Sequence, residues 1–466
     1  MESTKKLSQV QSICPVCNKP LIAWYTDRGG KVFLEKECPE HGAYKALVSN
    51  STKDYLEWIE NPVINIPPKE AITEGSDESQ CPLNCGVCEK HMQTACCVLI
   101  DITERCNQHC PYCFARADEN DVTAKEPSLD ELERKLDLLI KLGEEERPFN
   151  IQLSGGEPTV RNDLPEIIRM ARSKGFEYIQ INTNGRRLAL EEGYAKILKD
   201  AGASVMFMQF DGTNDDIYMA TRGEPLLDIK KQAIRNCEKT GLAVTLVPTV
   251  IRDVNLENIG EMMDFMLENV NVVKGIHFQP VSFFGRHPEE DAQGGDFEGR
   301  VTMFDILRKL EEQRPQFKYQ DFCPISTGHA LCCFYSTYIK EPNNSVRCTL
   351  TAAKKAAGVT CCDVSQMTHR DRMNVVKKDR DYVMEKWEVA DPEEVQRDQN
   401  KYTSSMDIMS MDEFLTYYRR NTFTVTGMAF QDATNMDAER VKRCRVQVLS
   451  DDDRLIPFCA YNSFYR

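Results

Sequence analysis

Residues 98–115 read VLIDITERCNQHCPYCFA, a short β-rich run followed at once by three cysteines. The cysteines form the pattern Cys106-x3-Cys110-x2-Cys113. Three thiolates at this spacing can hold three corners of a cubane iron–sulfur cluster and leave the fourth iron open. Structural zinc sites usually supply CxxC pairs and four protein ligands. We therefore predict a catalytic cluster on this loop, with structural zinc as the alternative.

Strand and helix patterns alternate after this motif. Further β-rich runs occupy residues 149–155, 178–185, 204–212, 243–250 and 275–281. Helical patterns lie between them, and the clearest has leucines at helical spacing at positions 129, 132, 136 and 139. The alternation predicts an α/β fold, a partial (β/α)6 barrel of the TIM type over residues 98–320. In such barrels the functional loops lie at the carboxyl ends of the strands.

The cysteine motif, with the aromatic Tyr112 before its last cysteine, resembles the signature of the radical S-adenosylmethionine (SAM) superfamily. SGGEPT (154–159) and NTNG (182–185) match its SAM-binding motifs in order and spacing. The resemblance implies reductive cleavage of SAM to a 5′-deoxyadenosyl radical, which abstracts hydrogen from an unactivated carbon. It also implies SAM and barrel-mouth contacts for Tyr112, Gly155, Gly156, Glu157, Pro158, Asn182, Asn184, Gln209, Asp211 and Gln279.

A second cysteine run precedes the barrel, within a linker and auxiliary segment that we place at residues 61–97. Its pattern, Cys81-x3-Cys85-x2-Cys88, repeats the spacing of the first motif. The repeat predicts an auxiliary iron–sulfur cluster. Its fourth ligand is Cys96, Cys97 or a later cysteine.

Residues 1–60 form a small module with its own ligand set, Cys14-x2-Cys17 and Cys38-Pro-Glu-His41. Three thiolates and one imidazole suit a ribbon-like or rubredoxin-like site for zinc or mononuclear iron. We expect a structural metal here, with electron entry as the alternative.

The C-terminal region, residues 321–466, carries eight loosely spaced cysteines. They predict a further cluster, or else buried thiols without metal. The candidate ligands are Cys348, Cys361, Cys362, Cys444 and Cys459. With this further cluster the chain would hold three [4Fe–4S] clusters and one mononuclear metal. We expect structural roles for Cys237 and His277, and expect Met206 and Met208 to pack against helices.

The composition favours metal binding by the cysteines over disulfide bonds. The chain of 466 residues has twenty cysteines and a net charge of −15. It shows neither a secretory signal nor the run of about 18 apolar residues that spans a membrane. These features predict a cytoplasmic protein, in which thiols stay reduced, and leave a peripheral membrane contact open. The acidic balance argues against stable nucleic-acid binding.

The order of the motifs covers nearly the whole chain and ends in MAFQDATNMDAERVKRCRVQV (428–448) and LIPFCAYN (455–462). This order is similar to the family that contains the archaeal tetraether lipid synthase and the methanopterin-precursor methylases. The resemblance implies C–C bond formation, with electrons from a donor such as ferredoxin or flavodoxin. Lipid-chain coupling is the first substrate hypothesis. Methylation of a cofactor precursor is the second, followed by modification of a peptide or RNA. A zinc-ribbon scaffold without catalysis is the alternative of another class.

Overall fold

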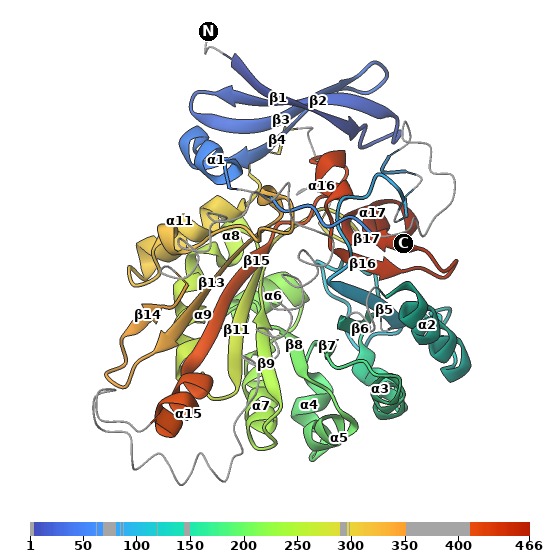
Figure 1. Cartoon of the computed structure of the whole chain (residues 1–466), viewed down its shortest axis with the longest axis vertical. Coiled ribbons are helices and arrows are strands. Elements are labelled where there is room, and N and C mark those ends of the chain that lie inside the picture. The colour runs from blue at the N-terminus through green and yellow to red at the C-terminus, as the bar shows by residue number, and fades with distance from the viewer. Residues whose placement is uncertain are drawn as a thin grey trace.

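The computed structural model describes residues 4–61, 63–68, 81–83, 85–86, 88–118, 120–143, 150–288, 296–297, 299–350 and 411–466. A small antiparallel sheet at the N-terminus lies against a large, mostly parallel sheet with helices on its outer face (Figure 1).

All six predicted barrel strands form, and each pairs in parallel with its neighbours in the order β5-β6-β7-β8-β9-β11. The short strand β10 follows β9 and also pairs with β11. The bounds are β5 (Cys97–Thr103), β6 (Asn150–Gly155), β7 (Ile179–Thr183), β8 (Val205–Gln209), β9 (Ala243–Val247), β10 (Thr249–Val250) and β11 (Val273–Pro280).

Helices connect these strands, as in a TIM-type barrel. Helix α2 (Leu129–Leu142) starts at a capping box of Ser128 and Glu131. It buries Leu132, Leu136 and Leu139 of the predicted leucine stripe, and Leu129 is half-buried. In the part of the chain that the structure describes, no helix is long and apolar enough to cross a membrane. The remaining barrel helices are α3 (Leu164–Ser173), α4 (Arg186–Leu190), α5 (Tyr194–Ala201), α6 (Asp215–Arg222), α7 (Leu227–Glu238), α8 (Arg252–Asn255), α9 (Ile259–Glu268) and α11 (Met303–Gln313).

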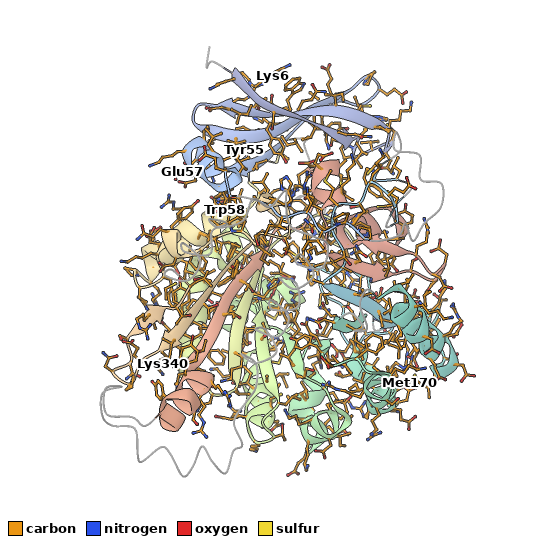
Figure 2. All side chains as sticks on the ribbon, in the orientation of Figure 1. Lys6, Tyr55, Glu57, Trp58, Met170 and Lys340 are labelled. Carbon is orange, nitrogen blue, oxygen red and sulfur yellow. The ribbon has the colours of Figure 1, made fainter. Side chains whose placement is uncertain are left out.

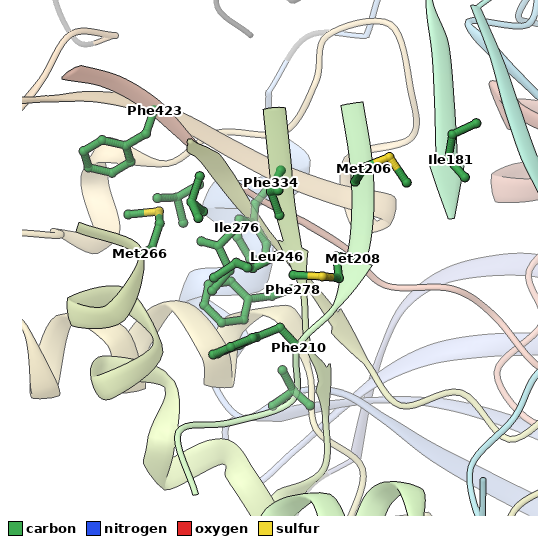
Figure 3. Packing of buried hydrophobic residues seen from close by; sticks show 14 of the residues in the cluster. Ile181, Met206, Met208, Phe210, Leu246, Met266, Ile276, Phe278, Phe334 and Phe423 are labelled. Atoms are coloured by element: carbon green, nitrogen blue, oxygen red, sulfur yellow. The ribbon is translucent and has the colours of Figure 1, made fainter. Parts of the chain in front are cut away.

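The main hydrophobic core lies between the sheet and these helices (Figure 3). Met206 and Met208 on β8 are buried in this core, as predicted. Because side chains alternate along a strand, Phe207 and Gln209 of β8 point to the opposite side, the inner face of the barrel. Cys237 on α7 is also buried in this core, which agrees with the structural role that we expected for it.

The C-terminal region continues the same sheet across the predicted boundary at residue 320. Strand β15 pairs in parallel with β11, and β16 pairs in parallel with β5, so eight parallel strands lie side by side. Parallel pairing joins segments far apart in sequence, which local patterns do not reveal. The elements are β13 (Cys333–Lys340), β14 (Val346–Cys348), α15 (Met411–Asn421), β15 (Thr422–Met428), α16 (Ala438–Lys442), β16 (Val446–Leu449), β17 (Leu455–Pro457) and α17 (Phe458–Ala460).

The N-terminal module rests on the C-terminal region. Tyr25 Oη donates to Asp437 Oδ2 (2.7 Å). Trp58, labelled in Figure 2, donates from Nε1 to the carbonyl of Ala330 (2.8 Å). A strand from the barrel region, β12, pairs with β4 and so joins the N-terminal sheet. The bounds are β1 (Thr4–Ile13), β2 (Pro20–Arg28), β3 (Lys31–Cys38), β4 (Gly42–Ser49), α1 (Thr52–Ile59) and β12 (Asp296–Phe297).

A buried ion pair fastens the C-terminal region to the barrel. Arg300 Nη2 donates to Asp432 Oδ2 (2.8 Å), and both side chains are less than 5% exposed. The same carboxylate oxygen accepts from the backbone N–H of Phe283 (2.8 Å). Removing one partner of such a pair leaves an uncompensated buried charge.

We expect Asp432→Asn to destabilise the protein by about 3–5 kcal/mol, because Arg300 would stay charged and buried. The measurement is the melting temperature of the anaerobically reconstituted protein. Asp200→Asn is the control, since Asp200 pairs with Lys196 in an exposed ion pair. Equal melting temperatures for the two variants would show that the buried pair does not hold the region in place.

Candidate active site and metal centres

The three cysteines of the first motif lie on the loop after β5, at the carboxyl end of the parallel strands. Burial, together with the nearby Glu157 carboxylate and the thiols of Cys110 and Cys113, raises the pKa of Cys106 to about 12. Burial also raises the pKa of Cys110, and the adjacent Arg222 opposes this rise. The loop thus gathers three thiols beside a cation, as a cluster with anionic ligands requires.

The glycines of the GGE motif let its loop contact the cysteine loop directly. The N–H of Gly156 donates to Thr103 O (2.8 Å), and the N–H of Glu157 donates to Arg105 O (2.8 Å). A Cβ at Gly155 would lie 2.0 Å from Thr103 O, and one at Gly156 would lie 2.2 Å from Arg105 O. Only glycine therefore permits this backbone contact.

The carboxylate of Glu157 organises the neighbouring loops and is fully buried. Oε1 accepts from the hydroxyls of Thr159 (2.5 Å) and Thr183 (2.7 Å), and Oε2 accepts from the N–H of Asn184 (2.6 Å). Asn184 Nδ2 in turn donates to Asn107 Oδ1 (2.7 Å), on the cysteine loop. The predicted SAM-binding segments after β6 and β7 are thus brought together at the cysteines. Pro158 opens the short turn that follows Glu157.

Asp211 acts on the cysteine loop through an arginine. Its carboxylate accepts from Arg222 Nε (2.6 Å) and Nη2 (2.9 Å) and from the N–H of Thr249 (3.0 Å). Arg222 Nη1 donates to the carbonyl of Tyr112 (2.9 Å), between two of the cysteines. The predicted barrel-mouth residue Asp211 therefore positions Arg222, and Tyr112 contributes its backbone to this contact.

Two further cations at the site are missing from the sequence prediction. Arg286, on the loop after β11, donates from Nε to Cys110 O (2.7 Å) and from Nη2 to Ala117 O (2.6 Å). Lys230 of α7 is buried and donates to Asn184 O (2.6 Å) and Gln209 Oε1 (2.8 Å). Neither lies in a local motif, so only tertiary contacts identify them.

The remaining predicted barrel residues line the inner face. Asn182, two residues before Asn184, donates to Ser154 Oγ (3.1 Å). Gln279 is half-buried on β11 and its N–H donates to Pro248 O (2.9 Å). His277, on the same face, contacts Thr426 Oγ1 (2.8 Å), and burial lowers its pKa to about 4.

The N-terminal module gathers a set of four ligand atoms. The ligand atoms of Cys14, Cys17, Cys38 and His41 all lie within 4.8 Å of one another. Cys17 Sγ and Cys38 Sγ are 3.9 Å apart, and His41 Nδ1 lies 3.7 Å from Cys14 Sγ and 3.5 Å from Cys38 Sγ. Tetrahedral zinc with ordinary bond lengths requires about 3.8 Å between sulfurs and about 3.6 Å between sulfur and nitrogen. The residues present therefore fit one metal ion.

The cysteines of the two other motifs are arranged differently. In the described part of the chain, no group with ligand atoms within 4.8 Å includes Cys106, Cys110 and Cys113, or the second motif. A cubane separates its thiolates more widely than a single ion does, because each binds a different iron.

The second motif packs against the C-terminal residues. Burial raises the pKa of Cys85, and the thiols of Cys81 and Cys88 raise it further. The N–H of Cys85 donates to Tyr465 Oη (2.6 Å), and Arg454 Nη1 donates to Cys85 O (3.1 Å). The three thiols are thus gathered at one place, beside a cation.

The grouping of the C-terminal cysteines in the structure differs from the predicted ligand set. Burial raises the pKa of Cys444, and the thiols of Cys459 and Cys332 raise it further. Cys332 accepts from Arg440 Nε (3.4 Å) and is missing from our predicted ligands. Cys348 lies on β14 instead. Its register partner on β13 is Tyr338, five residues along the strand from Cys333. Cys361 and Cys362 lie outside the described residues.

We expect Gly156→Ala to lose iron from the catalytic cluster, because the new Cβ would push the GGE loop away from Arg105. The measurement is the iron content of the reconstituted protein, with an expected deficit of up to about four iron atoms per chain. Gly299→Ala is the control, since a Cβ there meets no atom within 4 Å. Full iron content in Gly156→Ala would contradict the role of this contact.

We expect Cys17→Ser to remove about one metal ion per chain, since the four-ligand set would lose a thiolate. Elemental analysis by mass spectrometry measures this loss. The control is Cys237→Ala, which alters a core cysteine remote from the donor set. Retention of the ion by Cys17→Ser would refute the assigned ligand set.

Comparisons with known proteins agree with this architecture. Residues 100–266 match the radical SAM superfamily, and residues 6–50 match the HMPTM N-terminal zinc ribbon domain. The 7,8-dihydro-6-hydroxymethylpterin dimethyltransferase of Methanocaldococcus jannaschii is 34% identical over 98% of this chain and 93% of its own. The Fe-coproporphyrin III synthase of Methanosarcina barkeri is 31% identical over 53% of this chain and 60% of its own.

Among solved structures, Streptococcus suis SuiB is similar with a TM-score of 0.39 and 17% identity, over 49% of this chain and 48% of that one. The relative from Methanocaldococcus jannaschii matches nearly end to end, across the zinc ribbon, the barrel and the C-terminal region. The chain is therefore a radical SAM enzyme and belongs to the family of the 7,8-dihydro-6-hydroxymethylpterin dimethyltransferase.

Proposed function

We propose that this enzyme methylates carbon atoms of a reduced pterin. The observation that carries the proposal is the match to a pterin dimethyltransferase at 34% identity over 98% of this chain. The net reaction replaces a substrate C–H bond with a C–CH₃ bond. A ferredoxin or flavodoxin supplies the electrons, and a separate donor supplies the one-carbon unit.

The chain's own residues prepare the site for SAM. When bound, a reduced [4Fe–4S] cluster supplies the electron that cleaves SAM to a 5′-deoxyadenosyl radical. Backbone contacts of Gly156 and Glu157 hold the SAM-binding loop against the cysteine loop. Arg222 and Lys230 place two buried cations beside the thiolates, where they offset the negative charge of the ligands.

The inner face of the barrel favours a polar substrate over an alkyl chain. Toward the carboxyl ends of the strands it presents Gln209, His277, Gln279, Thr426 and Tyr335, all half-buried. An alkyl chain in this place would bury their polar atoms without new hydrogen bonds, at a cost. Lipid-chain coupling, our first hypothesis from sequence, therefore has less support than methylation of a small molecule.

The cofactor set that we propose is three [4Fe–4S] clusters and one mononuclear ion. The three thiols at Cys81, Cys85 and Cys88 support an auxiliary cluster. Cys332, Cys444 and Cys459 support a further one in the C-terminal region. For the mononuclear ion we favour zinc with a structural role, because the module matches a zinc ribbon and its distances suit zinc.

We expect the reconstituted enzyme, given SAM and a strong reductant, to form 5′-deoxyadenosine and to add one or two methyl groups to 7,8-dihydro-6-hydroxymethylpterin. The one-carbon donor is supplied in separate assays as SAM itself and as a reduced pterin that carries a methylene group. Mass spectrometry measures both products.

The variant with Cys106, Cys110 and Cys113 all replaced by Ala is the control, and we expect it to form neither product. Formation of 5′-deoxyadenosine by this variant would refute the assigned cluster site. Failure of the wild-type enzyme to methylate the pterin, while it couples or alkylates isoprenoid lipid chains, would refute pterin methylation and restore the lipid hypothesis.

A further inference from the structure

A band of mostly polar side chains crosses the inner face of the sheet, below the cysteine loop. Asp101 on β5 is the register partner of Ser154 on β6. Asn182 on β7 donates to Ser154 Oγ (3.1 Å) and is the register partner of Phe207 on β8. Phe207 in turn is the register partner of Thr245 on β9. We call these five residues the inner band.

The inner band points away from the hydrophobic core. On β5, β8 and β9 the residues on either side of its members belong to the core between sheet and helices, as Met206 and Met208 do on either side of Phe207. Ile100 and Ile102 flank Asp101 in the same way. Because side chains alternate along a strand, the band faces the interior of the barrel.

Two oxygens of the inner band are buried and have no hydrogen-bond partner within the described residues: Asp101 Oδ1 and Thr245 Oγ1. Thr245 is only 2% exposed. The other carboxylate oxygen of Asp101 is bound by Arg466, so the side chain is held in place while Oδ1 stays unpaired. Buried polar atoms without partners are rare, and those at a substrate site take partners from the ligand.

Phe207 gives the band an aromatic face. It is half-buried, although Met206 and Met208 beside it are fully buried. Its ring centroid lies 5.2 Å from that of His277, on the side toward the mouth of the barrel. A flat ring can stack on such a face while its edge reaches the polar members of the band.

We propose that the inner band binds the 2-amino-4-oxopyrimidine ring of the substrate, with Asp101 Oδ1 as the acceptor for its N–H groups. This ring carries its amino group and a ring N–H on one edge, which a carboxylate complements. The Thr245 hydroxyl hydrogen-bonds to the opposite part of the heterocycle, and Phe207 stacks on its face. The inference rests on the proposed function and names the residues that recognise the pterin.

The experiment measures anaerobic binding of 7,8-dihydro-6-hydroxymethylpterin to the reconstituted enzyme by equilibrium dialysis. Guanosine, which has the same ring edge, is the second probe. We expect Asp101→Asn to weaken binding of both probes by about 10- to 100-fold, as for loss of a hydrogen bond to a charged group. We expect Thr245→Val to weaken binding of the pterin by about 3- to 10-fold.

Two controls separate recognition from folding. Arg466→Gln removes the ion pair but keeps the Asp101 carboxylate, and we expect it to weaken binding of the pterin less than Asp101→Asn does. Asp200→Asn changes an exposed carboxylate and should bind as wild type does. Iron content and melting temperature show that each variant is folded. Should Asp101→Asn not fold, the same comparison is made with Thr245→Val alone, and wild-type affinity in that variant overturns the proposal.

Unchanged binding by Asp101→Asn overturns the proposal, as does an equal loss in Arg466→Gln, which would assign the effect to the ion pair. Either result leaves pterin methylation intact if the wild-type enzyme still makes that product. Binding of guanosine that depends on Asp101, without binding of the pterin, supports the inner band and overturns the proposed function. Binding of neither probe to the wild-type enzyme overturns both.

Discussion

The backbone contact between the GGE loop and the cysteine loop is the constraint on which the active site depends. Two N–H groups, of Gly156 and Glu157, donate to the carbonyls of Thr103 and Arg105 at the start of the cysteine loop. The contact is possible because Gly155 and Gly156 carry no Cβ. Glu157 then extends it to the loop after β7 through buried hydrogen bonds. One short motif thereby sets the relative positions of three loops around the cluster.

The C-terminal region is the common partner of the other parts of the molecule. It adds β15 beside β11 and β16 beside β5, at the two edges of the predicted barrel. It also contacts the metal-binding module through Asp437 and the auxiliary cysteines through Tyr465. Because it pairs with both edges of the barrel and contacts both other cysteine motifs, this region links the cysteine loop of the active site to each of them. The buried pair of Arg300 and Asp432 holds it against the barrel.

The inner face of the barrel connects this architecture with the choice of substrate. Polar side chains line it at two levels, and the hydrophobic core is confined to the opposite side of the same strands. A polar heterocycle can satisfy these groups, whereas an alkyl chain cannot. The family resemblance in the sequence left lipid and pterin chemistry open, and the polar inner face supports our proposal of a polar substrate.

The sequence by itself determined the local features of this protein. Cys106, Cys110 and Cys113, the GGE motif and the six β-rich runs each depend on residues close together in the chain, so spacing and periodicity predict them. The N-terminal donor set is of the same kind, with Cys14 and Cys17 on one knuckle and Cys38 and His41 on another.

Only the tertiary structure decided which distant residues meet. Arg222 and Arg286 bind the cysteine loop from separate elements, and Lys230 binds the neighbouring loop after β7. In the C-terminal region Cys332 lies with Cys444 and Cys459, and Cys348 lies elsewhere. The eight-stranded parallel arrangement likewise depends on pairing across hundreds of residues. Such contacts carry no local pattern, because they arise from packing and long-range hydrogen bonds and not from the spacing of neighbouring residues.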